Sequence, residues 1–209
     1  MPARLSREDL YTLEKYAEIR SDFRARVMAH KKARRLPLGV NANLYFEDRL
    51  TVHYQVQEML RIERIFERTA IEEELAAYNP LIPDGHNWKA TFMLEYDDRA
   101  ERAEMLAKLV GIEDCVWMRV GAGPLITPIC DEDIERATED KTSSVHFMRF
   151  ELSAEDISAL KQGAEISAGI SHPQYTCQVA PVAAEFRRSL VNDIDFNHRG
   201  HRAHGEKIT

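Results

Sequence analysis

The chain has 209 residues, of which 44% are hydrophobic and 30% are charged, and its formal net charge at pH 7 is −7. No apolar run approaches the roughly 18 residues that a transmembrane helix requires, and the start, MPARLSREDL, lacks the apolar core of a secretory signal. We therefore expect a cytoplasmic protein without a membrane span. Its 3 cysteines are widely spaced and form no Cys-x-x-Cys motif, so neither a disulfide framework nor a zinc site is indicated.

The N-terminal part is predicted to be helical and basic. Ser6 and Asp9 form a capping signal for a first short helix, Ser21 caps a second one, and Pro37 with Gly39 ends it. Residues 1–49 carry 11 Lys and Arg against 7 Asp and Glu, although the whole chain is acidic. The densest positive cluster consists of Lys31, Lys32, Arg34 and Arg35.

This basic cluster has three interpretations: a solvated face, a nucleic-acid or phosphate patch, or a dock for the acidic remainder of the same chain. Nucleic-acid binding depends on neutralising phosphates. The chain as a whole is acidic, and neither an aromatic platform nor a groove-reading motif accompanies the cluster. We therefore favour intramolecular docking or a solvated face over nucleic-acid binding. The four residues are also candidates for contacting a partner protein.

The stretch from Phe46 to Pro83 is predicted to be helical. At about 100° per residue, one stripe contains Val52, Val56, Met59, Glu63, Phe66 and Ala70. Residues 50–57 also alternate like a strand, but the helical period continues through Phe66 and favours a helix. An unpaired carboxylate on a buried stripe is costly. We therefore expect Glu63 to be buried and either paired with an N-terminal arginine, protonated, or bound to a metal.

The opposite face of this helix carries His53, Gln57, Arg61, Arg64 and Arg68. Because Arg64 and Arg68 are like charges four residues apart, we expect their counter-charges to come from another element or from an acidic partner. A solvated face is the alternative interpretation. Thr69 and Glu72 form a capping box, so the helix is predicted to break at Thr69, and Asn79-Pro80 ends the shorter helix that follows.

The C-terminal half is predicted to be a mostly antiparallel sheet with flanking helices. Helices are expected after the capping residues Asp98 and Ser153 and over 182–194, and strands over 88–96, 115–120, 125–129, 144–152, 164–170 and 175–179. Residues 131–140 look superficially like a calcium loop, but Arg136 stands where an EF-hand needs glycine, so a solvated connection is expected. The tail histidines, His198, His201 and His204, are spaced by three and would suit a divalent ion on a helix, but the polar residues and glycines of this segment favour a disordered end.

These elements together predict an α+β fold in which a helical part, 1–83, packs on a sheet part, 84–195. We expect residues 1–195 to form a single domain and residues 196–209 to be a disordered tail.

The sequence resembles a bacterial family described as a domain of unknown function. The segments that carry the resemblance are RARVMAHKKARRLPLG, FEDRLTVHYQVQEMLRIERI, EEELAAYNPLIP and VHFMRFEL, and it extends through most of residues 6–193. Members of this family are often encoded beside a rubrerythrin and an iron–sulfur oxidoreductase subunit. The resemblance thus implies a redox or peroxide-stress setting, but it supplies no catalytic residue.

Two functional hypotheses follow. The chain contains no Gly-x-Ser-x-Gly, His-Glu-x-x-His or Walker motif, which favours a non-catalytic accessory protein without a cofactor. Such a protein would bind an acidic redox partner, for example the iron–sulfur subunit or rubrerythrin, through Arg61, Arg64 and Arg68 or through the basic cluster. The alternative is a metal-dependent enzyme or metal-binding protein that uses a divalent ion held by His53, Glu63, His146 and His172.

Overall fold

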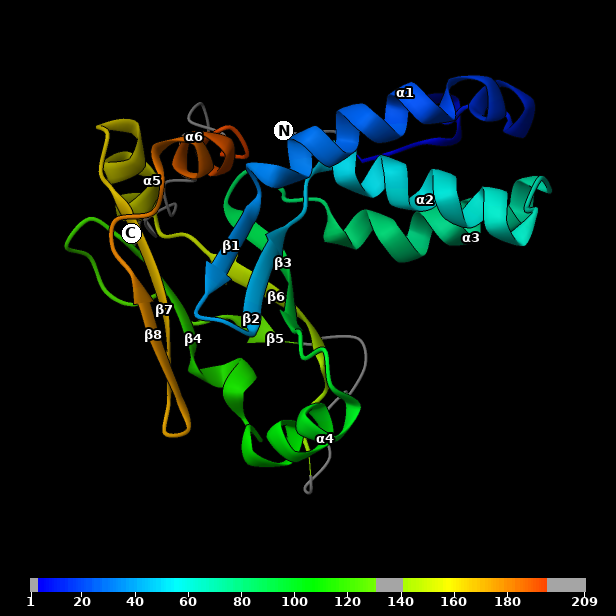
Figure 1. Ribbon diagram of the computed structural model, residues 1–209. Coiled ribbons are helices and arrows are strands. Elements are labelled where there is room, and N and C mark those ends of the chain that lie inside the picture. Colours follow the sequence, from blue (N-terminus) through cyan, green and yellow to red (C-terminus); the bar gives the residue numbers. More distant parts are fainter. Residues whose placement is uncertain (1–3, 131–140, 195–209) are drawn as a thin grey trace, which may run out of the picture.

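Helices come first and strands dominate the remainder of this chain, whose computed structural model describes residues 4–130 and 141–194 (Figure 1). The helices are α1 (Leu13–Lys32), α2 (Arg49–Glu63), α3 (Arg68–Tyr78), α4 (Arg99–Lys108), α5 (Ala154–Lys161) and α6 (Ala184–Val191), with short 3-10 turns η1 (Arg7–Asp9), η2 (Asn79–Leu81) and η3 (Ile112–Cys115). The α+β class is confirmed.

Two antiparallel sheets enclose the main core. One has the strand order β1-β2-β3-β6-β5, with β1 (Arg35–Leu38), β2 (Ala42–Phe46), β3 (Asn87–Leu94), β5 (Ile129–Cys130) and β6 (Val145–Glu151). The other has the order β4-β7-β8, with β4 (Val116–Val120), β7 (Ile166–His172) and β8 (Tyr175–Val179). Alternate residues of β3 are buried, as its period of two predicted. The predicted strand 125–129 is reduced to an isolated bridge between Met118 and Ile126, with β5 following it.

The β1–β2 hairpin was not predicted, because Pro37 was interpreted only as a helix stop. Pro37 is tolerated in β1 because this is an edge strand of the sheet. The turn depends on Gly39, whose φ of 82° suits glycine, and a Cβ there would lie 2.6 Å from the Tyr175 hydroxyl. That hydroxyl donates to Leu38 O at 2.8 Å and accepts from Asn41 N at 3.2 Å. A residue remote in sequence therefore shapes this turn.

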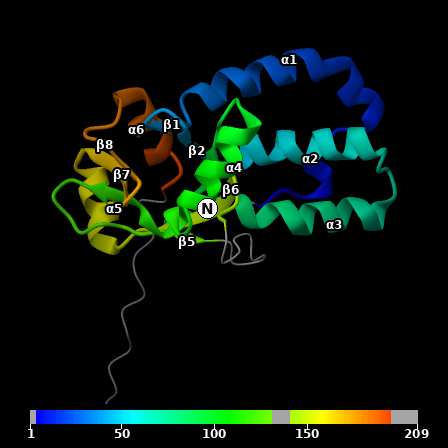
Figure 2. The same ribbon diagram turned by 60° about the horizontal axis from the view of Figure 1, so that its bottom comes forward.

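Helices α1, α2 and α3 form a bundle that extends away from the sheets, with α2 in the middle (Figure 2). Its two apolar clusters are separate from the sheet core, and their buried members are Leu5, Val52, Val56, Leu60, Leu75 and Ile82 in one and Tyr16, Phe23 and Val27 in the other. The Ser6–Asp9 capping box is present at η1. The helix start predicted at Ser21 is wrong, because α1 runs unbroken from its N-cap, Thr12, through that position.

The expected burial of Glu63 is wrong. Helix α2 ends at Glu63 because Arg64 adopts a left-handed conformation, and α3 begins after Glu67 rather than at Thr69. The apolar stripe therefore continues from Val56 to Leu60 and stops there. Glu63 lies on the exposed side of the last turn, and Phe66, which belongs to the loop, is exposed as well.

The arginine–carboxylate pair expected for Glu63 is formed by Glu58 instead. Arg20 of α1 donates two parallel hydrogen bonds to this carboxylate, from Nε and Nη2, each at 2.8 Å. The Tyr16 hydroxyl donates a third at 2.7 Å, and Arg61 lies 3.2 Å away. The Arg20 guanidinium is the largest cause of a lowered pKa for Glu58, about 2. This cluster fastens α1 to α2.

Arg34 joins the bundle to the sheets. Its side chain is 2% exposed, and its Nε donates to Phe46 O at 2.9 Å and its Nη2 to Glu47 O at 2.9 Å. The guanidinium also binds both carboxylate oxygens of Asp193, the shorter contact being 2.6 Å, and Nη1 donates to Ser189 Oγ at 3.0 Å. The end of α1, the β2–α2 connection and the end of α6 are thereby held at one cation.

Replacing Arg34 with alanine should lower the free energy of unfolding by about 3–5 kcal/mol, because Asp193 and several carbonyls would lose their partner inside the protein. Arg35→Ala is the matched control, since that side chain is half exposed and its ion pair with Glu95 is loose. Urea unfolding at pH 7 measures both. Equal midpoints for the two variants would contradict the central role of Arg34.

Glu58→Gln should lower the free energy of unfolding by about 1.5–3 kcal/mol at pH 7, the usual worth of a hydrogen bond to a charged group. The pKa of Glu58 is about 2 in the folded state, below the ordinary value near 4.3. The contribution of the pair is therefore present above about pH 4.3 and is lost as pH falls towards 2. Unfolding curves at several pH values should show wild type and variant converging in acid. Glu63→Gln, at an exposed site, should leave stability nearly unchanged.

Candidate functional site

The far end of the bundle exposes large apolar side chains. Ile62, in the last turn of α2, is 62% exposed, and Phe66, in the α2–α3 loop, is 71% exposed. We call this region, residues 60–71 together with the N-terminal strap formed by residues 4–12, the bundle tip. These two side chains, which we call the apolar patch, are exposed within five residues of one another, and apolar side chains exposed close together mark surfaces that contact other proteins.

A hollow of about 520 Å³ opens beside this patch. The strap and the start of α1 form one wall, and the end of α2 with the start of α3 forms the other. Its apolar lining consists of Leu10, Tyr11, Leu13, Leu60, Ile65, Phe66 and Ile71, and Arg7, Glu8, Thr12 and Glu14 stand around it. An apolar floor with polar groups at the edge suits a buried anchor from another molecule.

Arg64 separates the two helices at the tip and is held in an unusual backbone conformation. Its φ of 56° places a non-glycine residue in the left-handed region, where its N–H donates to Leu60 O and ends α2. Glycine is the residue usually found at this position of a helix end. The Arg64 side chain is exposed and takes part in none of the ion pairs formed among the described residues. The loop thus carries a cation at a conformational cost.

The two other arginines of the predicted basic face have local partners. Arg61 contacts Glu58 at 3.2 Å, and Arg68 contacts Glu72, four residues on in α3, at 2.9 Å. The expectation that the counter-charge of Arg68 comes from another element is therefore wrong, because an acid at helical spacing was available to it, as one was to Arg61. His53 and Gln57 are buried, so this face is not a continuous basic surface.

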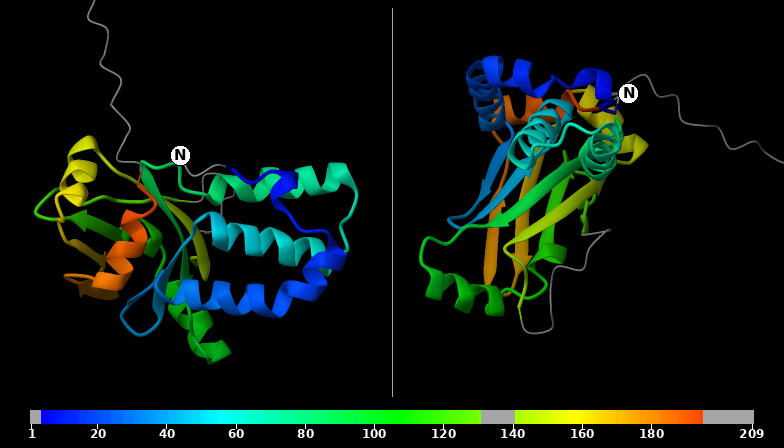
Figure 3. Two further views of the ribbon diagram at one scale, coloured as in Figure 1. Left: turned by 90° about the horizontal axis from the view of Figure 1, so that it is seen from above. Right: turned by 90° about the vertical axis from the view of Figure 1, so that its right-hand side faces the viewer.

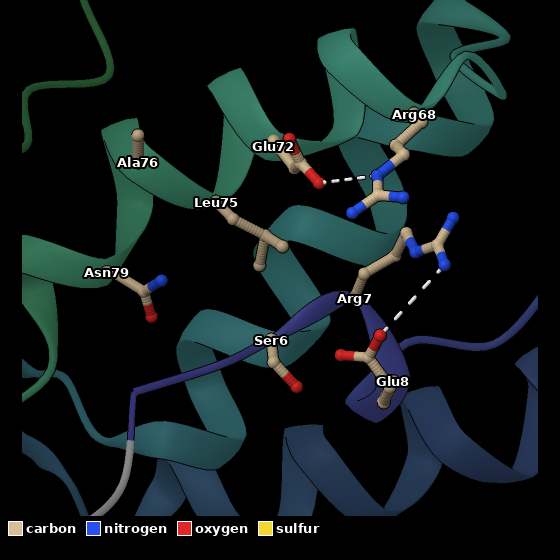
Figure 4. A pocket seen from close by; sticks show the side chains of 8 residues that line it. All are labelled: Ser6, Arg7, Glu8, Arg68, Glu72, Leu75, Ala76 and Asn79. Carbon is tan, nitrogen blue, oxygen red and sulfur yellow. Dashed lines mark hydrogen bonds and ion pairs between the residues drawn. The ribbon is translucent and has the colours of Figure 1, made fainter.

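Arg68 and Glu72 also border a second, more polar hollow of about 390 Å³ on the other side of the strap (Figure 4). Figure 4 shows the side chain of Arg7, on the strap, near that of Arg68, on α3, each beside an acid of its own. Asn79 uses both ends of its amide to hold the backbone of Leu5, at 2.8 and 2.9 Å. This hollow presents polar groups that already have partners.

The basic cluster lies at the opposite end of the bundle, because α1 spans 20 residues, which corresponds to about 30 Å. Arg34 is buried and cannot contact a partner, so its assignment as a partner-binding residue is corrected, and the intramolecular dock is confirmed for it. Arg35 binds Asn43 Oδ1 at 2.9 Å on the outer face of the sheet. Lys32 is exposed and Lys31 is half-buried, and both remain predictions.

The structure does not bring the proposed metal ligands together. His53 is on α2 and His146 and His172 are on strands of different sheets, while Glu63 is exposed at the bundle tip. The described residues contain no group of three or more His, Cys, Asp or Glu side chains placed to hold a metal ion. Residues 131–140 and the tail histidines lie outside the described part of the chain.

Two of the three histidines have clear structural roles. His146 is fully buried, and its Nε2 lies 2.8 Å from Thr142 Oγ1, which in turn donates to Glu113 Oε2 at 2.9 Å. His172 contacts Val110 O at 3.2 Å. The His146 ring therefore satisfies buried polar groups within the sheet part, as buried polar side chains normally do, and the His172 ring pairs with a carbonyl just after α4.

Sequence reasoning missed the features that form the bundle tip. It placed Phe66 on the buried stripe, and it gave the strap no role beyond a short helix. One polar residue gave an available signal, since Gln57 is buried in an otherwise apolar environment. Its amide binds the strap: Tyr11 N donates to Oε1 and Nε2 donates to Tyr11 O, both at 3.0 Å.

Within the described residues, no helix has the length and apolar character needed to cross a membrane.

Comparison with known proteins gives consistent results. A crystal structure described as a novel protein of unknown function from Burkholderia pseudomallei is 48% identical, with a TM-score of 0.87, and the alignment covers 92% of this chain and 100% of that chain. No curated protein matches the sequence. The model of a family described as protein of unknown function, DUF3501, matches residues 4–194. Because this match spans nearly all of the chain, the protein belongs to the DUF3501 family.

Proposed function

We propose that this protein is a non-catalytic partner-binding protein and that the bundle tip is its docking surface. The observation that carries the proposal is the exposure of Phe66 and Ile62 beside an apolar hollow. Burying a large apolar side chain is worth about 1.5–3 kcal/mol, and the chain forgoes this gain twice at one turn. A partner that covers the turn would recover it.

The chemistry of the rim indicates what kind of partner fits. Arg7 lines the hollow, and Arg64 lies between Ile62 and Phe66 in the chain, whereas Arg61 and Arg68 are engaged in their ion pairs. A suitable partner surface presents an apolar side chain for the hollow and a carboxylate for Arg64. Apolar anchors supply most of the affinity in such contacts, and rim charges mainly raise the association rate.

The family resemblance suggests where to look for such a partner. An acidic redox protein, namely a rubrerythrin or an iron–sulfur oxidoreductase subunit encoded nearby, would place this chain in a redox or peroxide-stress setting. The bundle tip offers apolar contact and guanidinium groups, which suit recognition of a protein surface. We therefore infer an accessory role, in which the bundle tip binds the partner and the sheet part serves as scaffold.

Phe66→Ala should weaken binding to the partner by at least tenfold without lowering the melting temperature, because the side chain is an anchor that contributes little to the fold. Biolayer interferometry with purified rubrerythrin and purified iron–sulfur subunit from the same genome measures the affinity. Val40→Ala is the control, since Val40 is 92% exposed at the distant β1–β2 turn. Unchanged affinity for Phe66→Ala, or an equal loss for Val40→Ala, would reject the docking site.

Arg64→Gly should separate binding from stability. Glycine relieves the left-handed backbone, so the free energy of unfolding should stay the same or rise by up to about 1 kcal/mol. Loss of the exposed charge should at the same time slow association with an acidic partner and reduce its salt dependence. Lys161→Ala, which removes an exposed charge at the end of α5 in the sheet part, is the control. A variant that is less stable and binds normally would show that Arg64 serves the scaffold.

A further inference from the structure

The strap, residues 4–12, is held by side chains rather than by a backbone ladder. It crosses the bundle towards the start of α1 (Figure 3) and forms one wall of the apolar hollow. The side-chain amide of Asn79 forms two hydrogen bonds with the backbone of Leu5 near one end of the strap, and the amide of Gln57 forms two with the backbone of Tyr11 near the other. Arg49 adds an ion pair to Asp9 at 2.6 Å. These few contacts make the strap the most easily released wall of the hollow.

Three rings meet where the strap joins the bundle. Tyr11 of the strap stacks on His53 of α2, with centroids 5.6 Å apart and an interplanar angle of 18°. Phe23 of α1 contacts both, at 5.2 Å from His53 and 5.9 Å from Tyr11. His53 is only 8% exposed, and its buried Nε2 has no hydrogen-bond partner among the described residues. The His53 ring is therefore held mainly by its contacts with the two aromatic rings.

We propose that His53 is a proton-sensitive latch: its neutral ring holds the strap closed, and its protonation releases the strap and widens the hollow at the bundle tip. The biological meaning of this latch rests on the proposed docking function, because the hollow is the docking surface. The movement of the strap itself does not depend on a partner, so the two ideas can fail separately.

The charges that face His53 disfavour an imidazolium at this position. Arg49 is on its own helix and Arg26 is on α1, while the nearby carboxylate, Asp9 of the strap, is already paired with Arg49. Gln57 is uncharged and its amide is hydrogen-bonded to Tyr11, and both Gln57 and Asp9 act on His53 in the opposite direction, towards a higher pKa. A protonated ring would bury an N–H without an acceptor beside two guanidiniums. Burial, followed by the charge of Arg49, lowers the pKa of His53 below its ordinary value of 6.5.

The direction of the pH response follows from this lowered pKa. The closed strap is fully favoured above about pH 6.5, where His53 is neutral in both states. As pH falls below that value, the open form binds the proton more readily, and the ratio of open to closed rises by up to tenfold per pH unit until the pKa of the closed state is reached. The pKa of Asp9 is about 2, lowered by hydrogen bonds at Ser6, so Asp9 does not titrate in this window.

Hydrogen exchange of the full chain followed by mass spectrometry tests the latch. After correction for the intrinsic pH dependence, protection over residues 5–12 should fall by about tenfold between pH 7 and pH 5. Protection of α1 and of the sheets should not change. In His53→Phe, which retains the ring contacts and cannot be protonated, strap protection should be equal at the two pH values. His86→Gln is the control and should respond like wild type.

Several results would overturn the proposal. These are unchanged strap protection in wild type, a persistent pH response in His53→Phe, and an NMR-titrated pKa of 6.5 or higher for His53 in wild type. The titration needs no variant, so it remains decisive if His53→Phe folds poorly. Phe66→Ala distinguishes the two ideas: a normal strap response with unchanged partner affinity rejects docking and retains the latch, whereas an absent response with lost affinity does the reverse.

Discussion

The buried guanidinium of Arg34 fixes how the two parts of this protein sit on one another. A cation this deeply buried is tolerated only when its N–H groups are paired, and here carbonyls of the β2–α2 connection and the Asp193 carboxylate supply the acceptors. Burial raises the pKa of Asp193 to about 6 while Arg34 opposes that rise, so at neutral pH the carboxylate is ionised and pairs with Arg34. Segments far apart in sequence must therefore come together before any of these charges is satisfied. The basic run at the end of α1 thus contains one buried arginine, Arg34, which joins the bundle to the sheets and which we call the Arg34 joint. Its neighbours Lys32 and Arg35 are ordinary surface residues.

Much of the sheet could be predicted because its signals are local. Alternating burial along β3 and the capping box of Ser153 with Asp156 each depend on residues within a few positions of one another. The β1–β2 hairpin could not be found in this way. Its turn is stabilised by the hydroxyl of Tyr175, and Pro37 is compatible with a strand only because no further strand pairs on that side. Information of this kind exists only in the folded arrangement.

The candidate site was predicted in its chemistry and misplaced in its position. An N-terminal arginine does reach a carboxylate on α2, but the carboxylate is Glu58, because the burial of a helical residue depends on where the helix ends as well as on its period. The left-handed residue at Arg64 stops α2 before the stripe can continue, and this turns Phe66 from an expected core residue into an exposed one. A helix end without glycine or proline carries little sequence signal. The left-handed Arg64 thus explains why the burial of Phe66 was predicted wrongly, and it also accounts for the exposed apolar side chains at the bundle tip.

The two ends of the bundle differ in how much free energy is needed to displace them: the end at the Arg34 joint is rigid, and the bundle tip opens more easily. At the joint, charged groups are buried and hydrogen-bonded, so any displacement exposes unpaired charge at a cost of several kcal/mol. At the tip, the side-chain amides of Asn79 and Gln57 each form two hydrogen bonds with the strap, and Asp9 adds one partly exposed ion pair, each hydrogen bond being worth about 1 kcal/mol net. The buried Leu5 side chain and the ring contacts of Tyr11 complete the attachment, which contains no buried charge. Local opening therefore requires far less free energy at the tip than at the joint. A surface that must change shape when it meets a partner is best built at that end, where movement leaves the scaffold intact.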